Sequence, residues 1–365
     1  MRHGWASFGN AARAGVLLAA LAWHAPAQAE PYLAVANGLK CVQCHVNPTG
    51  GSMRSVFGNV WNGTQLPAVK LGGTPWTGQL GRYLAVGADV RWDAIETSTT
   101  GGSTRKSEFA DSHVYLGVNL VPERLLLYAD EQVTPGSPQN REAWALFWSA
   151  NHTWYVKAGE MYLPYGLRLQ DNTALVREAT GIDMTVPGRG VELGWLTGHW
   201  DAQLALSNGP FSAGPRGSGR DVTANLAYVE SGWRVGLAAD ANAALRAGHR
   251  NAVGVFGGLK TGPIAWLAEA DLVSDASQPG GPHRLGGLLE ANYSPARGHN
   301  LKVSAEYLDP QRGTPHQQFG RLSVVYEVVP VRFLQLRLGA RYYGTSDAQP
   351  ADRLRFYFLE LHGFF

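Results

Sequence analysis

The chain has 365 residues and a formal net charge of +2, with 31 lysine and arginine residues against 29 aspartate and glutamate residues. Without a basic excess, the composition gives no reason to expect nucleic acid as a partner. Charged residues make up only 16%, whereas glycine numbers 45 and tryptophan and tyrosine together number 26. A low-charge, exported chain rich in glycine and aromatic residues is typical of an outer-membrane β-barrel.

Residues 1–29 have the features of a secretory signal peptide. Arg2 and Arg13 precede an apolar run at 14–23, and Ala27-Gln28-Ala29 supplies a small-residue cleavage site. The apolar run is too short to cross a bilayer as a helix. Its removal would leave 29 basic and 29 acidic residues, so the mature chain is expected to be close to neutral.

The sequence Cys41-Val42-Gln43-Cys44-His45 is a C-x-x-C-H motif that contains the only two cysteines of the chain. This spacing suits thioether attachment of one c-type haem through Cys41 and Cys44, with His45 as the proximal iron ligand. A zinc site usually needs a second pair of ligands, and no other cysteine supplies one. A redox dithiol is usually found near a βαβ pattern, which is absent from the sequence.

From residue 79 onward the sequence alternates between apolar and polar residues, as in strands with two different faces. The first run sets Val86, Ala88 and Val90 against Asp89 and Arg91. About sixteen such strands are expected over residues 79–365, joined alternately by long segments and tight turns. This sorting, together with an aromatic C-terminal residue, favours an all-β, antiparallel outer-membrane barrel over a soluble β-sandwich.

Residues 30–78 are too few to form a self-sufficient core, so we expect a short haem-binding plug inside the barrel or at its periplasmic mouth. The connection at 163–188 is the longest. It is expected either to fold inward and narrow the pore or to lie outside as a docking surface.

The segments Gly38–His45 and Arg54–Gly58, followed by a barrel, resemble the fused monohaem c-type cytochrome–porin family of outer-membrane iron oxidases. Residues 46–51 depart from that pattern. The resemblance implies that Cys41 and Cys44 hold the haem and that His45 is the proximal ligand. Met53 is the nearest candidate for the distal ligand, with Met161, Met184, His113 and His152 as further candidates. Arg54 is a candidate partner for a haem propionate.

Two functions follow from the sequence. The first is electron transfer across the bacterial outer membrane. An iron-oxidising activity would pass electrons inward, from extracellular Fe(II) or another external donor to a periplasmic c-type cytochrome or other soluble carrier. Outward flow would pass them to an external acceptor. The second is a porin-like solute channel in which the haem segment is a plug, gate or sensor. Both place the barrel among outer-membrane lipids, and conductance would distinguish them.

Overall fold

A computed structural model describes residues 30–209, 219–244, 248–276, 283–314, 317–345 and 354–365. The expected signal peptide, 1–29, lies outside these residues. The described helices are α2 (Pro31–Asn37), α3 (Cys41–Cys44), α4 (Val56–Gln65) and α5 (Leu175–Thr180). The strands are β1 (Gln79–Leu80), β2 (Leu84–Thr99), β3 (Gly102–Phe109), β4 (Ser112–Val121), β5 (Leu125–Thr134), β6 (Gln139–Trp148), β7 (Trp154–Met161), β8 (Gly188–Thr197), β9 (Trp200–Ser207), β10 (Gly219–Glu230), β11 (Trp233–Ala244), β12 (Gly248–Thr261), β13 (Ile264–Asp275), β14 (His283–Tyr293), β15 (His299–Asp309), β16 (Phe319–Val331), β17 (Leu334–Thr345) and β18 (Leu354–Phe364).

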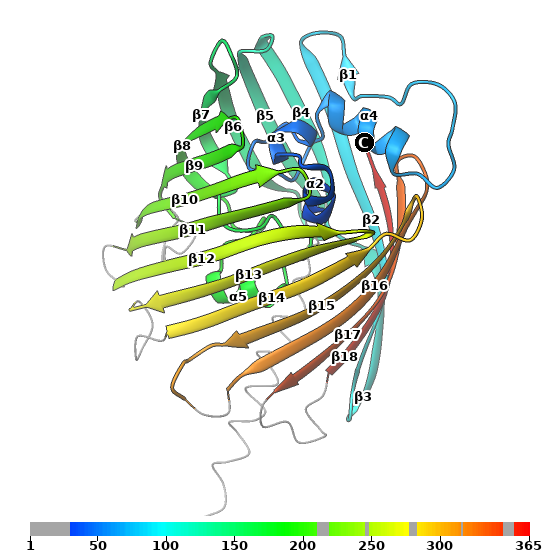
Figure 1. The fold of residues 1–365 in the computed structure, drawn as a ribbon, viewed down its shortest axis with the longest axis vertical. Coiled ribbons are helices and arrows are strands. Elements are labelled where there is room, and N and C mark those ends of the chain that lie inside the picture. The colour runs from blue at the N-terminus through cyan, green and yellow to red at the C-terminus, as the bar shows by residue number, and fades with distance from the viewer. Residues whose placement is uncertain (1–29, 210–218, 245–247, 277–282, 315–316, 346–353) are drawn as a thin grey trace, which may run out of the picture.

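The strands form a closed antiparallel barrel (Figure 1). Each strand from β4 to β18 pairs with the next, and β18 closes the ring by pairing with β2. Both β3 and β4 pair with β2. Strand β3 pairs with the C-terminal half of β2 and β4 with its N-terminal half, so β3 and β4 act as one interrupted strand. Counted in this way, the described residues form the sixteen-stranded barrel expected from the sequence.

The two-residue alternation separates lumen-facing from outward-facing residues. On β2, Asp89 and Arg91 are buried whereas Val90 is 46% exposed. The same pattern recurs on β13, where Glu269 and Asp271 are buried and Leu272 is exposed. The apolar side chains therefore face outward, and the charged side chains line the lumen, as in a membrane barrel.

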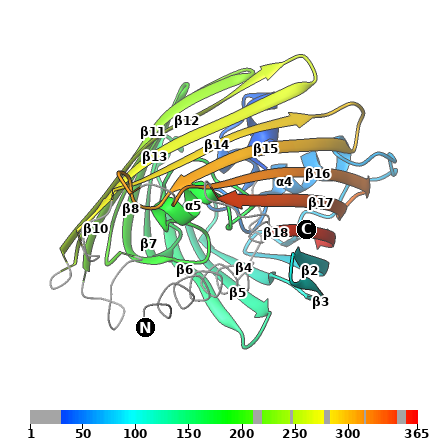
Figure 2. The same cartoon turned by 90° about the horizontal axis from the view of Figure 1, so that it is seen from below.

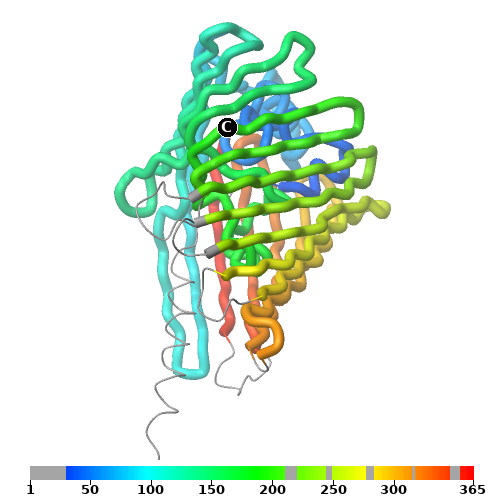
Figure 3. Tube along the Cα trace, turned by 90° about the vertical axis from the view of Figure 1, so that its left-hand side faces the viewer, coloured from blue at the N-terminus to red at the C-terminus, as the bar shows by residue number. Residues whose placement is uncertain are grey.

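The connections are sorted between the two ends of the barrel. One end, which we call the short-turn end, carries tight connections such as 122–124, 198–199 and 262–263. The C-terminus also lies there, as Figure 1 shows. At the opposite end, the hairpin of β2 and β3 extends well beyond its neighbours (Figure 3). Short turns gather at one end of the barrel, as expected from the sequence. The strict alternation of long and short connections is not found, because the long connection expected at 95–105 is a turn of only two residues, 100–101, between β2 and β3.

Two segments occupy the lumen. At the short-turn end, α2 packs against β11, β12 and β13. Deeper in the barrel, α5 of the long connection packs against β13, β14 and β15, and Figure 2 shows it surrounded by strands. Of the two positions predicted for the connection at 163–188, the one in which it folds into the barrel is therefore correct. Among the described residues, no helix is both long and apolar enough to span a membrane.

Glycines allow these two helices to approach the wall closely. A Cβ on Gly258 of β12 would lie 2.5 Å from Val35 of α2. Likewise, a Cβ on Gly286 of β14 would lie 2.8 Å from Ala179 of α5. Both helices consequently pack directly on the barrel backbone, which positions the N-terminal segment relative to the strands.

Candidate functional site

A cavity of about 430 Å³ lies between the N-terminal segment and the barrel wall. Its volume falls in the range of ordinary ligand pockets. The lining includes all three residues predicted to hold haem, Cys41, Cys44 and His45. Its apolar and aromatic lining residues include Tyr32, Leu33, Leu39, Trp61, Leu66, Phe256 and Phe364.

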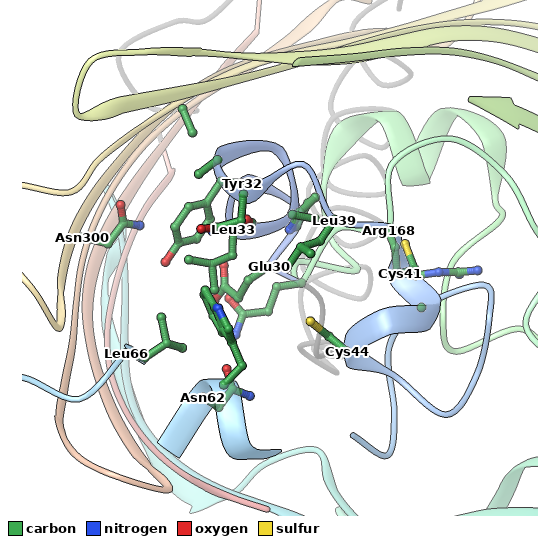
Figure 4. Close-up of a pocket in the computed structure, with 18 of the residues that line it drawn as sticks. Glu30, Tyr32, Leu33, Leu39, Cys41, Cys44, Asn62, Leu66, Arg168 and Asn300 are labelled. Atoms are coloured by element: carbon green, nitrogen blue, oxygen red, sulfur yellow. The ribbon is translucent and has the colours of Figure 1, made fainter. Parts of the chain in front are cut away.

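The short helix α3 presents both cysteines to this cavity. Their sulfur atoms are directed into the space between α3, α2 and α4 (Figure 4). The helix is fixed at its start because the Lys40 backbone N–H donates to Gln43 Oε1 at 2.8 Å. It is fixed at its end because the Ser55 backbone N–H donates to the Cys44 carbonyl at 3.0 Å. The C-x-x-C spacing thus places two thiols on one face of a single helical turn.

The His45 side chain is half-buried and lines the same cavity. His45 forms an isolated antiparallel bridge with Arg54, which holds the backbone in an extended conformation after α3. Its Nδ1 atom is buried without a hydrogen-bond partner. Burial, reinforced by the nearby Arg54 guanidinium, lowers the pKa of His45 to about 3. The imidazole is therefore neutral at physiological pH, which is the form that binds a metal.

Two glycines follow the motif at positions where a side chain has no room. Gly50 has φ +92°, and a Cβ there would lie 3.2 Å from Cys41 Sγ. Gly51 has φ +82°, and a Cβ there would lie 2.7 Å from Met184 Sδ. Both backbone conformations favour glycine, so the Gly-Gly pair brings the chain close to Cys41 and to the long connection.

Three arginines surround the cysteines. Arg54, Arg168 and Arg234 line the cavity, and Figure 4 shows Arg168 beside Cys41. The Nη1 atom of Arg54 and the Nε atom of Arg234 are buried without a hydrogen-bond partner. Arg54 also pairs with Asp89 at 4.0 Å, and Arg234 donates through Nη2 to the Leu39 carbonyl. The remaining N–H groups suit an anionic ligand group such as a carboxylate. The sequence singled out Arg54, but Arg168 and Arg234 come from distant parts of the chain and carry no local signal.

A buried polar network fixes the segment at 47–52 to the wall. Asn47 donates to Glu142 of β6 at 2.8 Å, and Ser52 donates to Asp130 of β5 at 3.1 Å. Lys157 of β7 donates to Asn47 Oδ1 at 3.1 Å and to Thr49 Oγ1 at 2.7 Å. These hydrogen bonds fix the position of the C-x-x-C-H motif relative to β5–β7.

The structure does not bring Met53 to the cavity. In the bridge of His45 and Arg54, the neighbouring pair Val46 and Met53 points to the opposite face. Met53 is 1% exposed and packs among wall residues that include Tyr115 and Tyr128. Because Met53 and His45 face in opposite directions, this geometry does not favour Met53 as a partner of His45 on one iron.

The further ligand candidates also lie elsewhere. None of Met161, Met184, His113 and His152 lines the cavity. Met161 packs in the same wall cluster as Met53, and Met184 packs with Tyr162. His113 is held between two carboxylates, Asp130 at 2.5 Å and Asp111 at 2.9 Å. His299 and His362 do line the cavity, and the sequence gave no indication of either.

The barrel is similar in fold to outer-membrane porins and channels. An anion-selective porin from Comamonas acidovorans matches with a TM-score of 0.62 at 12% identity, over 77% of this chain and 99% of the porin. The outer-membrane channel DcaP of Acinetobacter baumannii has a TM-score of 0.59 at 12% identity, over 77% and 97% of the two chains. OprB of Pseudomonas putida has a TM-score of 0.59 at 9% identity, over 78% and 95%.

No family model matches the chain, and no curated protein matches it. At identities of 12% and below, the likeness concerns the fold alone. The chain is accordingly a porin-fold barrel, to which a C-x-x-C-H segment facing a lumenal cavity is added.

Proposed function

We propose that this porin-fold barrel is an outer-membrane cytochrome that holds one c-type haem in its lumen and transfers electrons across the membrane. The observation that carries the proposal is the convergence of Cys41, Cys44 and His45 on one cavity. Bound there, haem would supply a one-electron redox centre. The short-turn end is then the periplasmic end, as in outer-membrane barrels generally.

The residues around the cavity fit such a group. Cys41 and Cys44 would hold it covalently, and neutral His45 would bind the iron. Arg54, Arg168 and Arg234 provide positive charge for two propionates. Tyr32 and Leu33 of α2 lie across the cavity from Cys44 in Figure 4 and would exclude water. Exclusion of water and nearby charge both tune a redox potential.

The two thiols are poorly suited to the alternative role of a redox dithiol. Burial raises the pKa of Cys41, and burial together with the neighbouring Cys41 raises the pKa of Cys44 to about 11. Reactive dithiols depend on a lowered thiol pKa. Both cysteines are therefore held as neutral thiols, so the environment supports a role in cofactor attachment.

Electron flow inward, from extracellular Fe(II) to a soluble periplasmic carrier, is the direction we propose, and outward flow to an external acceptor is its alternative. The test is the visible spectrum of the detergent-solubilised chain before and after anaerobic addition of Fe(II). Reduction of a covalent haem would support iron as a donor. A haem reduced by dithionite but not by Fe(II) would retain the cytochrome and reject iron. A chain without covalent haem would contradict the proposal.

A solute channel is the second candidate, and the fold comparisons favour it over the cytochrome because the matched structures are porins and channels. The cavity that reaches the short turns is consistent with this function. In this case the N-terminal segment would act as a plug or gate. Single-channel recording in planar bilayers distinguishes the candidates: open channels with the segment in place would favour transport, and a silent barrel would favour the electron conduit.

A further inference from the structure

The short-turn end carries more positive than negative charge. Lysine and arginine residues on its turns and on the adjoining N-terminal segment form what we call the rim cluster: Lys40, Lys70, Arg82, Arg124, Lys260, Arg297 and Arg332. All seven are exposed or half-buried. The carboxylates of the same turns and segment are Glu30, Glu123, Asp201 and Glu230. The excess is local, because the mature chain as a whole is close to neutral.

Several rim cations donate hydrogen bonds to carbonyls rather than to carboxylates, although the nearby Asp201 offsets part of the charge of Lys40. Lys40 Nζ donates to the carbonyls of Gly198 and Trp200, at 2.9 and 2.7 Å. Lys260 Nζ donates to a carbonyl of α2 at 3.3 Å, and Arg332 donates to the Leu71 carbonyl at 2.6 Å. Carbonyl acceptors orient these side chains but leave a full positive charge at the rim. The rim cluster therefore holds the N-terminal segment and also produces a positive field.

Three members of the rim cluster reach the cavity. Lys40, Lys260 and Arg297 line the cavity itself, together with the turn residues Gly262 and Gly298. Beside Cys44, the first turn of α4 exposes Val56 and Phe57, which are 46% and 47% accessible. Transient protein interfaces commonly combine an apolar centre with charged residues around it, and Val56 and Phe57 with the nearby rim cations have this composition.

We infer that this rim is the docking surface for the acidic face of a small soluble electron-carrier protein. The inference rests on the proposed function and identifies the chemistry of its partner. Complementary charge accelerates encounter and orients a partner, which suits a short-lived complex. A lipid surface fits less well, since lipids surround the outside of the barrel whereas Lys40, Lys260 and Arg297 line the cavity in its lumen.

The test uses the full chain in nanodiscs of zwitterionic lipid and a fluorescent soluble c-type cytochrome as the probe. Succinylation of the probe lysines makes it acidic, and the untreated basic form is its control. We expect only the acidic probe to bind, and to bind more weakly at 200 mM than at 20 mM salt, because screening acts on exposed charges.

The variant K70Q/R82Q removes two exposed rim charges. Neither side chain is among those that donate a hydrogen bond to a backbone carbonyl of the N-terminal segment, so the segment should stay in place. Each lost charge should weaken binding by about two- to fivefold. The matched control R105Q/K106Q removes two exposed charges of β3 at the other end and should leave binding unchanged. Equal effects of the two variants, or binding of the basic probe, would overturn the inference.

Binding is read from the probe, so it does not depend on haem in the barrel. Haem content of each preparation is measured separately by its absorbance. Absence of haem with intact, charge-dependent binding would contradict the proposed function and retain the docking surface. Covalent haem together with binding that does not depend on charge would retain the proposed function and contradict the docking surface.

Discussion

The side-chain amide of Asn47 donates to both carboxylate oxygens of Glu142, at 2.8 and 3.0 Å, and thereby joins the segment after the haem motif to strand β6. Neither residue is accessible to solvent. Lys157 binds Asn47 from the other side and pairs with Glu192 at 2.9 Å. Since water cannot replace a lost partner here, the network holds the segment in one position.

Asn47→Ala should loosen the N-terminal segment without unfolding the barrel. The substitution removes one buried hydrogen-bond partner from Glu142 and one from Lys157, at a cost of about 1–3 kcal/mol in the free energy of docking. Limited proteolysis should cleave residues 30–78 faster, while the β-sheet circular dichroism is retained. Asn37→Ala is the control, because the Asn37 amide binds only Leu33 within α2. Equal cleavage rates in the two variants would show that the network does not hold the segment.

Gly51→Ala should impair haem retention. Alanine at φ +82° costs about 1 kcal/mol or more, and its Cβ would contact Met184 at 2.7 Å. Haem-stained denaturing gels should show less covalent haem per barrel. Met184→Ala in the same chain should restore part of the loss, because it removes the contact but not the backbone strain.

Gly72→Ala is the matched control for this change. A Cβ there meets nothing within 4 Å, and the backbone does not have a positive φ. We expect a normal haem content. A loss as large as that of Gly51→Ala would mean that any side chain added to the segment is harmful, and would reject the local explanation.

The sequence predicted the barrel because its signal repeats in every strand. Alternation on β2, with Asp89 inside and Val90 outside, follows from strand geometry alone. It also predicted the haem motif as a local unit, since Cys41, Cys44 and His45 are adjacent in sequence. What it could not predict was orientation: Met53 is eight residues from His45, yet the antiparallel bridge turns the two side chains to opposite faces.

The position of the long connection was also beyond the sequence. Asp171 binds Arg321 at 2.9 Å and Arg341 at 2.8 Å, although 150 or more residues separate it from either. No periodicity relates residues so far apart. Length alone marked the connection as functional, and the inward fold depends on these specific pairs.

Asp171→Asn should release the long connection from the wall. The two guanidinium groups hold the pKa of Asp171 well below its usual value, although burial alone would raise it. A depressed carboxyl pKa gives stability that is fully present above the unfolded pKa, near 4, and lost as pH falls through the lower folded value. In the wild type the connection should therefore stay in place at pH 4, where ordinary carboxylates are half protonated.

The measurement is single-channel conductance and protease sensitivity of residues 163–187 between pH 7 and pH 3. Asp171→Asn should increase both at pH 7, because Arg341 loses its ion pair with this carboxylate and Arg321 loses one of its two carboxylate partners, keeping Glu306. Asp183→Asn is the control, since Asp183 accepts hydrogen bonds only from Thr185 nearby. Release of the wild-type connection between pH 5 and pH 4 would show that these ion pairs do not hold it.

His45→Ala tests the ligand assignment most directly. His45 is the cavity residue next to Cys44, and its buried Nδ1 has no other partner. Without this imidazole the iron loses its proximal ligand, so the native haem spectrum should fall to the level of a Cys44→Ala chain. His249→Ala is the matched control, because His249 is exposed at the start of β12, at the end of this strand opposite the short turn 262–263. The β-sheet dichroism should be unchanged in both. A normal haem spectrum and redox response in His45→Ala would reject His45 as the proximal ligand, whereas loss in both variants would point to failed export or assembly rather than ligation.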